Sequence, residues 1–240
     1  MRHILVCPRA EGARLRSEHP TLEVLEDDEP GVYAAINRGL RVEGAWDTWT
    51  WLNDDDRWNA AGIARGIERL DTRPEIALAY GKVRYISESG QPLGFLPIAS
   101  HPGWLRPLHA RGIAALSQQG TLVRRSALEM LGPLDTRFRL AADFSWWHRA
   151  LEAGLCAGFV DEHVADFRVQ RGQLSQHRAE MLGEIRSVVA AHGRGVSAIR
   201  GGGYAVLFRL VRLREIVARW RATGCWRTSS LLRKYGGGGV

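Results

Sequence analysis

The stretch AWDTWTWLNDDD, residues 45–56, is the part of the sequence that says most about the fold. Its first eight residues are rich in aromatic and β-branched side chains and predict a buried strand. The strand runs directly into Asn53 and three consecutive carboxylates, Asp54, Asp55 and Asp56. Because adjacent like charges repel, three of them at a strand end are costly unless something positive sits among them.

Strands and helices alternate on both sides of this stretch. Predicted strands cover residues 3–7, 21–26, 46–52, 76–86, 119–125 and 159–169, and predicted helices cover 10–18, 32–42, 59–70, 127–132, 143–153 and 176–191. A hairpin is expected over residues 88–91, and the four prolines of residues 92–112 indicate an irregular excursion. The alternation predicts an α/β domain over residues 1–192, with a mostly parallel central sheet flanked by helices. Ligands of such sheets bind beyond the carboxyl ends of the strands, where the three aspartates lie.

Composition places the chain among ordinary globular proteins. It has 240 residues, 45% hydrophobic and 25% charged, and a formal net charge of +7, which favours anionic partners. Three widely separated cysteines without metal-ligand spacing indicate a reducing compartment. The first residues lack the apolar run of a leader, and no stretch approaches the ~20 apolar residues that span a bilayer. We therefore expect a cytoplasmic protein, soluble or peripheral at the inner face of the cell membrane.

The C-terminal part differs in character from the rest. Residues 193–203 are glycine-rich and predict a linker, residues 204–235 predict a basic amphipathic helical tail, and residues 236–240 predict a disordered end. Apolar residues recur there at spacings of four and three: Val206, Leu210, Leu213, Val217 and Trp220. Residues 204–221 can thus lie on a membrane with their arginines toward anionic headgroups, or pack on the main domain or a partner subunit.

The aspartates have a chemical interpretation and a simpler one. On an extended backbone Asp54 and Asp56 project to the same side and Asp55 to the other, so two carboxylates can share a divalent cation. Oxygen ligands of this kind suit Mg²⁺ or Mn²⁺, which usually keep waters and bind substrate phosphates. The simpler interpretation is a solvated acidic loop, or an aspartate that caps the following helix.

Four segments, in one order along the chain, carry a family resemblance. They are EDDEPGVYAAINRGL (26–40), WLNDDD (51–56), QQGTLVRRSALEMLGPLDTRFRLAADFSWWHRA (118–150) and FRVQRGQLS (167–175). Together they resemble the family 2 glycosyltransferases of the GT-A fold, in which the aspartates are the DxD metal site, over roughly residues 20–180. The resemblance implies transfer of a sugar from a nucleotide-diphosphate donor to a hydroxyl of a glycan or lipid-linked acceptor.

The resemblance also implies roles on the donor side. A divalent cation, Mg²⁺ or Mn²⁺, would be held by Asp54 and Asp56 and would neutralise the departing diphosphate. The donor's nucleotide and sugar would be contacted by Glu29, Tyr33, Asn37, Asn53 and Asp55. For Tyr33 and Asn37 the alternative is a core tyrosine and a helix-ending asparagine.

On the acceptor side the resemblance implies that Asp143 is the general base. At the start of a helix this carboxylate would take the proton of the acceptor hydroxyl, and a single displacement would invert the anomeric carbon. The alternative for Asp143 is a plain helix cap. The acceptor or phosphate side would further include Gln119, Trp146, Arg168, Gln173 and Ser175, although a tryptophan at helical spacing is commonly part of the core.

The N-terminal part departs from the family pattern. Only HILVCPRAEGAR precedes the strand of residues 21–26, so either the family's first strand is missing or its second is reduced, or the start lies upstream of Met1. Loss of an inner strand would force the others to pair anew, because neighbouring strands lie about 4.8 Å apart. This leaves open a rival, a catalytically degenerate GT-A-fold binding module that lacks part of the nucleotide pocket. Nucleic-acid binding is supported only by the basic tail and is not expected.

Overall fold

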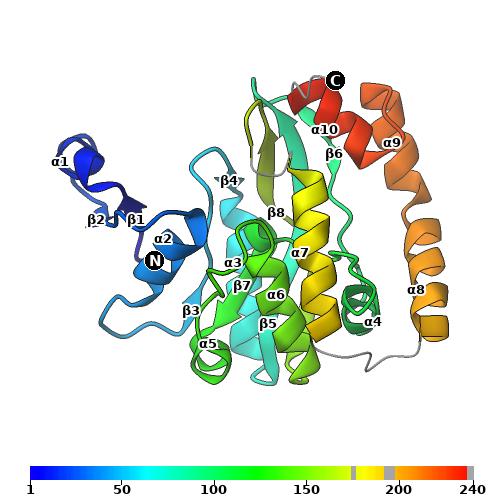
Figure 1. Cartoon of the computed structure of the whole chain (residues 1–240), viewed down its shortest axis with the longest axis horizontal. Helices are drawn as coiled ribbons and strands as arrows, with labels where there is room; N and C mark the ends of the chain where they lie inside the picture. The colour runs from blue at the N-terminus through cyan, green and yellow to red at the C-terminus, as the bar shows by residue number, and fades with distance from the viewer. Residues whose placement is uncertain (174–176, 192–197, 237–240) are drawn as a thin grey trace.

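The computed structural model is an α/β protein with one six-stranded sheet and a separate two-stranded one (Figure 1). The structure describes residues 1–173, 177–191 and 198–236. The strands are β1 (Ile4–Cys7), β2 (Glu23–Glu26), β3 (Thr48–Trp49), β4 (Arg57–Trp58), β5 (Ile76–Ser87), β6 (Pro92–Phe95), β7 (Thr121–Arg124) and β8 (Cys156–Val169). The helices are α1 (Arg9–Glu18), α2 (Val32–Leu40), α3 (Ala60–Thr72), α4 (Leu105–His109), α5 (Arg125–Leu131), α6 (Ala142–Glu152), α7 (Arg178–Ala191), α8 (Ala198–Val211), α9 (Leu213–Thr223) and α10 (Thr228–Gly236), with 3-10 turns at Pro102–Trp104 and Gln118–Gly120.

The main sheet is built around two long parallel strands. Its order is β3-β7-β5-β8-β4, with β6 paired to β5, and β5 and β8 run parallel over nearly their whole length. The pairs β3–β7, β5–β7, β4–β8 and β5–β6 are antiparallel, the last being the hairpin predicted around residues 88–91. The sheet is therefore mixed, where the sequence predicts a mostly parallel one, because the short strands run against the two long ones.

Helices cover both faces of this sheet. Neighbouring residues of β5 point to opposite faces, so the strand contributes side chains to a core on each side. Ala79 faces α3, where Ile63 and Leu70 are buried. Leu78 and Tyr80 face the larger core that α4 and α6 close, and the Tyr80 hydroxyl donates to Ala99 O at 2.8 Å. The two faces thus have separate hydrophobic cores, one on each side of β5.

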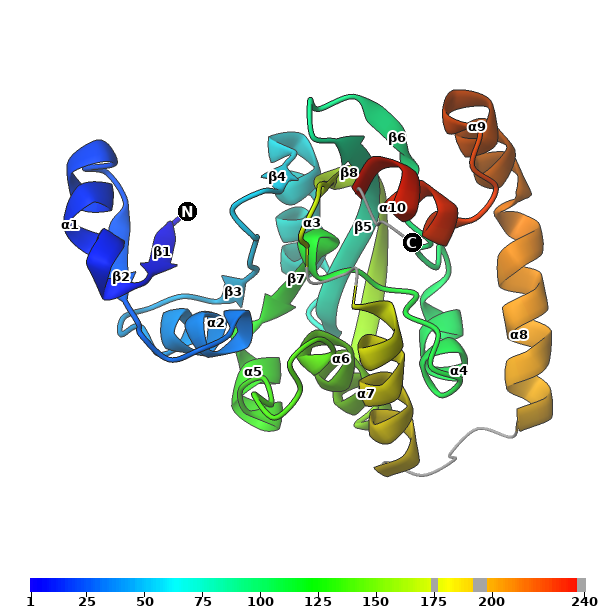
Figure 2. The same ribbon diagram turned by 45° about the horizontal axis from the view of Figure 1, so that its top comes forward.

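The first two strands do not join the main sheet. β1 and β2 pair parallel with each other, from Ile4 opposite Glu23 to Cys7 opposite Glu26. Figure 2 shows this pair and α1 beside α2, away from the six strands. The segment after α2 enters the main sheet as edge strand β3, against β7.

The C-terminal part forms three helices at the other end of the molecule from β1 and β2 (Figures 1 and 2). Helix α8 begins at Ala198, inside the range predicted as a linker, and the tail predicted from residue 204 is divided between α8, α9 and α10. Leu231 of α10 is buried against the end of the sheet with Tyr85 and Leu93. Within residues 1–173, 177–191 and 198–236, no helix has the length and apolarity to cross a bilayer.

Candidate active site

The aspartates lie in a turn that carries the chain from one edge of the sheet to the other. β3 and β4 are the two ends of the strand order, so residues 50–56 cross between them. The backbone N–H of Asp56 donates to Asn53 O at 3.2 Å, and Asp54 and Asp55 occupy the turn. The extended backbone predicted here, with Asp54 and Asp56 on one side, is wrong. In the turn the three side chains differ in environment: Asp54 is exposed, Asp55 is half-buried and Asp56 is buried.

Asp56 fixes the turn to the sheet. Its Oδ2 accepts a hydrogen bond from Gln119 Nε2 at 2.9 Å, and its Oδ1 accepts one from the backbone N–H of Arg168 at 2.8 Å. Only 7% of the residue is exposed. Burial raises the pKa of the Asp56 carboxyl to about 7, against the two hydrogen bonds that lower it, and the neighbouring Asp55 charge raises it further.

Asp55 contacts the loop that follows β8. Its Oδ2 accepts hydrogen bonds from Gln173 Nε2 at 2.8 Å and Gln170 Nε2 at 3.1 Å. Its backbone carbonyl accepts one from Arg168 Nε at 2.8 Å. The predicted residues Gln173 and Arg168 therefore meet the aspartate turn, and Gln170, which the sequence analysis did not single out, meets it as well. The signal for Gln170 was its place in the segment FRVQRGQLS.

Arg168, predicted on the acceptor or phosphate side, takes part in holding the aspartate turn. Its guanidinium donates to three backbone carbonyls: Asp55 at 2.8 Å, Glu88 at 2.7 Å and Ser87 at 3.2 Å. These carbonyls belong to the aspartate turn and to the end of β5. Through Nε and Nη1 the guanidinium thus holds the turn at the carboxyl ends of β5 and β8, and its predicted phosphate contact stays a prediction.

Four tryptophans connect the aspartate turn to α6. Trp51 stacks on Trp49 at 4.9 Å and on Trp147 at 5.6 Å between ring centroids, and Trp146 meets Trp49 edge-on at 5.9 Å. Trp146 is fully buried, and its Nε1 donates to Gly132 O at 2.9 Å. The predicted acceptor-side role of Trp146 is therefore wrong, because its ring is core and its one polar atom is already bonded.

Asp143 begins α6 and is held in a defined orientation. Its Oδ1 accepts hydrogen bonds from the Tyr33 hydroxyl at 3.0 Å and from the Phe144 N–H at 2.7 Å. Burial raises the pKa of Asp143, and burial together with the Asp143 charge raises the pKa of Tyr33. Trp147, one helical turn later, stacks on Trp51, which lies three residues before Asp54. The aspartate turn and the helix that carries Asp143 are thus packed together through this pair.

Glu184 of α7 positions the start of α6, and sequence reasoning missed it. Its Oε2 accepts from the N–H groups of Leu140 and Ala141, both at 2.8 Å, and its Oε1 accepts from the Arg139 N–H at 3.0 Å. These donors lie just before Asp143. Nothing in the local sequence of α7 indicates this role, because the partner backbone lies more than forty residues away.

The first motif divides between the site and the core. Tyr33 reaches Asp143, but Asn37 is buried and makes two bonds with Leu134: Nδ2 donates to its carbonyl at 2.8 Å and Oδ1 accepts from its N–H at 3.0 Å. Asn37 thus ties α2 to the loop before α6, and its predicted donor contact is wrong because both ends of the amide are engaged. Glu29 is exposed, and its N–H donates to Asp27 Oδ1 at 2.9 Å. The predicted Ser175 lies outside the described residues.

A divalent cation has carboxylate oxygens available at the turn, although no metal cluster is built around it. In the part of the chain that the structure describes, no three His, Cys, Asp or Glu side chains gather as a metal site. Asp56 uses both oxygens and Asp55 uses only Oδ2 in the hydrogen bonds above, while Asp54 is exposed. Asp54 and Asp55 therefore fit a cation such as Mg²⁺, which one or two carboxylates, waters and substrate phosphates hold in proteins.

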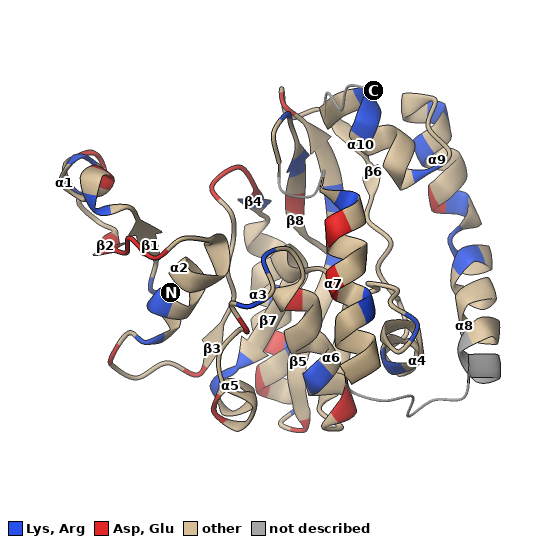
Figure 3. Ribbon diagram, in the orientation of Figure 1, with Lys and Arg blue, Asp and Glu red and all other residues tan. Residues whose placement is uncertain are grey.

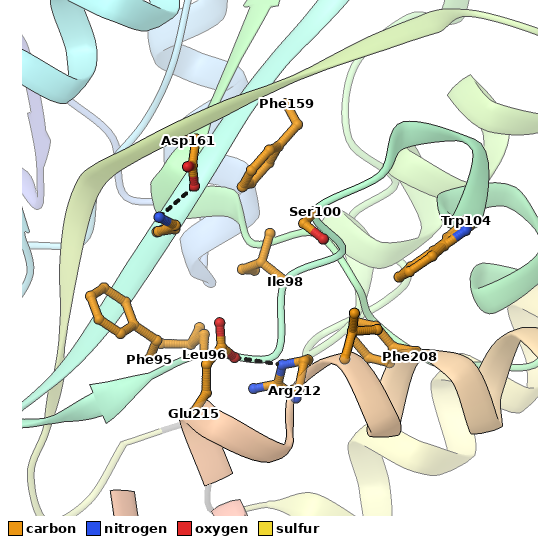
Figure 4. A pocket seen from close by; sticks show the side chains of 12 residues that line it. Phe95, Leu96, Ile98, Ser100, Trp104, Phe159, Asp161, Phe208, Arg212 and Glu215 are labelled. Atoms are coloured by element: carbon orange, nitrogen blue, oxygen red, sulfur yellow. Dashed lines mark hydrogen bonds and ion pairs between the residues drawn. The ribbon is translucent and has the colours of Figure 1, made fainter. Parts of the chain in front are cut away.

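A cavity of about 250 Å³ lies elsewhere, between the main sheet and the C-terminal helices (Figure 4). Aromatic rings and two ion pairs line it. The pairs are Lys82–Asp161, across β5 and β8, and Arg212–Glu215 at 2.9 Å, at the junction of α8 and α9. It shares no residue with the aspartate turn or with Asp143, so it is separate from the candidate site.

No protein-family model and no curated protein matches the sequence. Solved structures do match the fold. Residues 1–349 of S. aureus TarS, in complex with UDP, match with a TM-score of 0.58 at 12% identity, over 89% of this chain and 62% of that one. The mannosyltransferase PcManGT from Pyrobaculum calidifontis, in complex with GDP-Man and Mn²⁺, matches with a TM-score of 0.47 at 14% identity, over 98% and 75%.

The likeness to TarS confirms the predicted fold class. The chain spans 62% of the length of residues 1–349 of TarS, and at this identity the match is one of fold. Membership of family 2 stays a prediction.

Proposed function

We propose that the chain is a metal-dependent, inverting glycosyltransferase that moves a sugar from a nucleotide-diphosphate donor to a hydroxyl of a glycan or lipid-linked acceptor. The observation that carries this proposal is the aspartate turn, held at the carboxyl ends of β5 and β8 and packed against the helix that orients Asp143. The fold shared with the UDP-bound TarS supports it. Two roles in the proposal are specified further from the structure: the metal ligands and the base.

The metal ligands in this proposal are Asp54 and Asp55. Asp56, predicted as a ligand, instead fixes the turn, because Gln119 and the Arg168 backbone engage both of its oxygens. When bound, Mg²⁺ or Mn²⁺ supplies positive charge that stabilises the departing diphosphate. The Gln170 and Gln173 amides bond Asp55 through Oδ2, so Oδ1 would be the oxygen that holds the cation.

The base in this proposal is Asp143. Burial raises the pKa of the Asp143 carboxyl above its ordinary value, which makes it a better proton acceptor. The Tyr33 hydroxyl and the Phe144 N–H fix the carboxylate on one oxygen and leave Oδ2 for the acceptor hydroxyl. A single displacement, with base and leaving group on separate sides of the sugar, inverts the anomeric carbon. Asn53 and Glu29, on the rim of the turn and of α2, remain candidate donor contacts.

Calorimetry with UDP and GDP, with and without Mn²⁺, tests the donor half of the proposal. We expect wild type to bind one of them more tightly with Mn²⁺, and Asp55→Asn to lose this gain by about 10- to 100-fold. Asp143→Asn is the matched control, because it removes a carboxylate of the site without touching the metal: it should bind normally and lose transfer. An Asp143→Asn variant that still transfers sugar, or a wild type whose binding ignores Mn²⁺, would contradict the assignment.

One observation favours the rival, a binding module without activity. β1 and β2 form their own pair outside the main sheet, so the N-terminal segment does not extend that sheet. If the chain binds no nucleoside diphosphate under any metal condition but still binds glycans, the rival replaces the enzyme.

A further inference from the structure

The net positive charge of the protein lies in its C-terminal helices. Residues 198–236 contain eight arginines, Lys234 and one acid, Glu215, for a net charge of +8, while the rest of the chain has a net charge of −1. Figure 3 shows this basic colouring along α8, α9 and α10. The basic character that the whole composition suggested is therefore a property of one end of the molecule.

One side of α8 and α9 is committed to the main domain. Phe208 is buried in the core of the α4 and α6 face, and the Arg212 guanidinium lies 5.3 Å from its ring centroid and pairs with Glu215. Arg219 is 4% exposed and donates to the carbonyls of Cys225 and Trp226. These contacts fix which side of each helix faces inward, toward the cavity of Figure 4.

The other side exposes apolar side chains that nothing in the described chain covers. Its members are 41–56% exposed and run from α8 through α9 to the following loop: Val206, Leu207, Leu210, Leu213, Trp220 and Trp226. Trp220 and Trp226 stack on each other at 4.8 Å between ring centroids. Isolated exposed apolar residues are ordinary, but six along α8, α9 and the following loop form a patch of the kind that marks an interaction site.

Arginines surround this apolar patch. Arg209, Arg214, Arg221, Arg227 and Arg233 are exposed, and none of them takes part in the ion pairs of the described residues. Apolar and aromatic side chains next to unpaired arginines match the two layers of a membrane surface, acyl chains below and anionic headgroups above. The aromatic pair suits the boundary between these layers.

We propose that the outer side of α8 and α9 is a docking surface for an anionic lipid bilayer. A second copy of the chain fits less well, because the surface would meet another that also bears +8, and its one acid is already paired with Arg212. Nucleic acid would engage the arginines but leave the leucines and valines in water. The proposal goes beyond the transferase function and does not depend on it, since the surface lies apart from the aspartate turn.

Vesicle co-sedimentation tests the proposal on the full chain. We expect binding to vesicles that contain phosphatidylglycerol, weak binding to phosphatidylcholine alone, and a loss at high salt, because headgroup attraction is screened. The double variant Arg214→Gln/Arg221→Gln should partition about 25-fold more weakly, at about five-fold per arginine. Its matched control, Arg41→Gln/Arg186→Gln, removes two exposed arginines elsewhere and should bind like wild type.

A second variant tests the apolar part. Leu207→Ser/Leu210→Ser changes two exposed side chains, so the fold should persist, as circular dichroism will check, and partitioning should fall about tenfold or more. Absence of binding to anionic vesicles by wild type overturns the proposal. Equal binding by wild type and both test variants also overturns it. A third contrary outcome is a dimer in sedimentation velocity that the leucine variant abolishes, with no binding of wild type to vesicles. Binding of random oligonucleotides in place of vesicles would likewise refute it.

Discussion

Asp56→Asn should change how the stability of the protein depends on pH. In the folded chain burial raises the pKa of this carboxyl from 3.8 to about 7, so the folded state holds its proton over a range in which the unfolded state has lost it. Stability therefore falls as pH rises between these two values and levels off above the higher one. The variant has no proton to lose at this position, so its stability lacks this fall.

The magnitude follows from the size of the shift. About three pH units at 1.36 kcal/mol each give about 4 kcal/mol of destabilisation in wild type that is absent in the variant. At low pH the two proteins should be similar, because a neutral carboxyl and an amide have nearly the same shape. The protonated carboxyl of wild type and the amide of the variant each carry a donor where the ionised Asp56 accepts. The Gln119 amide must therefore turn in both proteins to present its oxygen.

The assay is urea unfolding in chelator-containing buffer, followed by tryptophan fluorescence, at a series of pH values from about 4 to about 7.5. The free energy of unfolding of Asp56→Asn, relative to wild type, should rise by about 4 kcal/mol across the series. Asp54→Asn removes a charge from the same turn at an exposed side chain and is the matched control. Parallel curves for wild type and Asp56→Asn, or a wild type that gains relative stability as pH rises, would refute the argument from burial.

Two further predictions concern packing and the base. Gly62→Ala should destabilise the protein by about 3 kcal/mol, because the added Cβ would lie 2.2 Å from the His163 carbonyl oxygen. Gly183→Ala has open space around it and should raise the free energy of unfolding by up to about 1 kcal/mol. Equal unfolding curves for the two variants would contradict this. Tyr33→Phe removes a hydrogen bond that lowers the pKa of Asp143, so the acidic limb of the kcat profile should move to higher pH, and an unmoved limb would argue against Asp143 as the base.

Local sequence signals predicted the elements well where one spacing of apolar residues, helical or alternating, continues through a whole segment. The strand expected over residues 76–86 is β5, Ile76–Ser87, and the helix expected over 59–70 is α3, Ala60–Thr72. The strand expected over residues 46–52 pairs only at Thr48–Trp49, because the chain must leave the sheet edge early to cross to β4. Pairing partners are a tertiary property, and the same reason explains the mixed sheet.

The candidate site shows the same division. Gln119, Gln173 and Arg168, which the sequence analysis assigned to the acceptor or phosphate side, all contact the aspartate turn: Gln119 from just before β7, Arg168 from the end of β8 and Gln173 from the loop after β8. The functions of individual side chains were harder to predict. Arg168 and Asn37 have polar groups typical of ligand-binding residues, and in both these groups form hydrogen bonds with backbone groups from distant parts of the chain.

The three aspartates can stand side by side because they do not share one environment. Asp56 is buried and its raised pKa reduces the charge that it contributes, Asp55 is bonded to two neutral amides, and Asp54 faces solvent. Repulsion within the turn is thus lowered because burial favours the neutral form of Asp56, and a positive ion is not needed for the turn to form. A cation that binds between Asp54 and Asp55 would then add to a turn already built. It follows that Asp54→Asn and Asp55→Asn should affect cation affinity more than stability, whereas Asp56→Asn should affect stability and its pH dependence first.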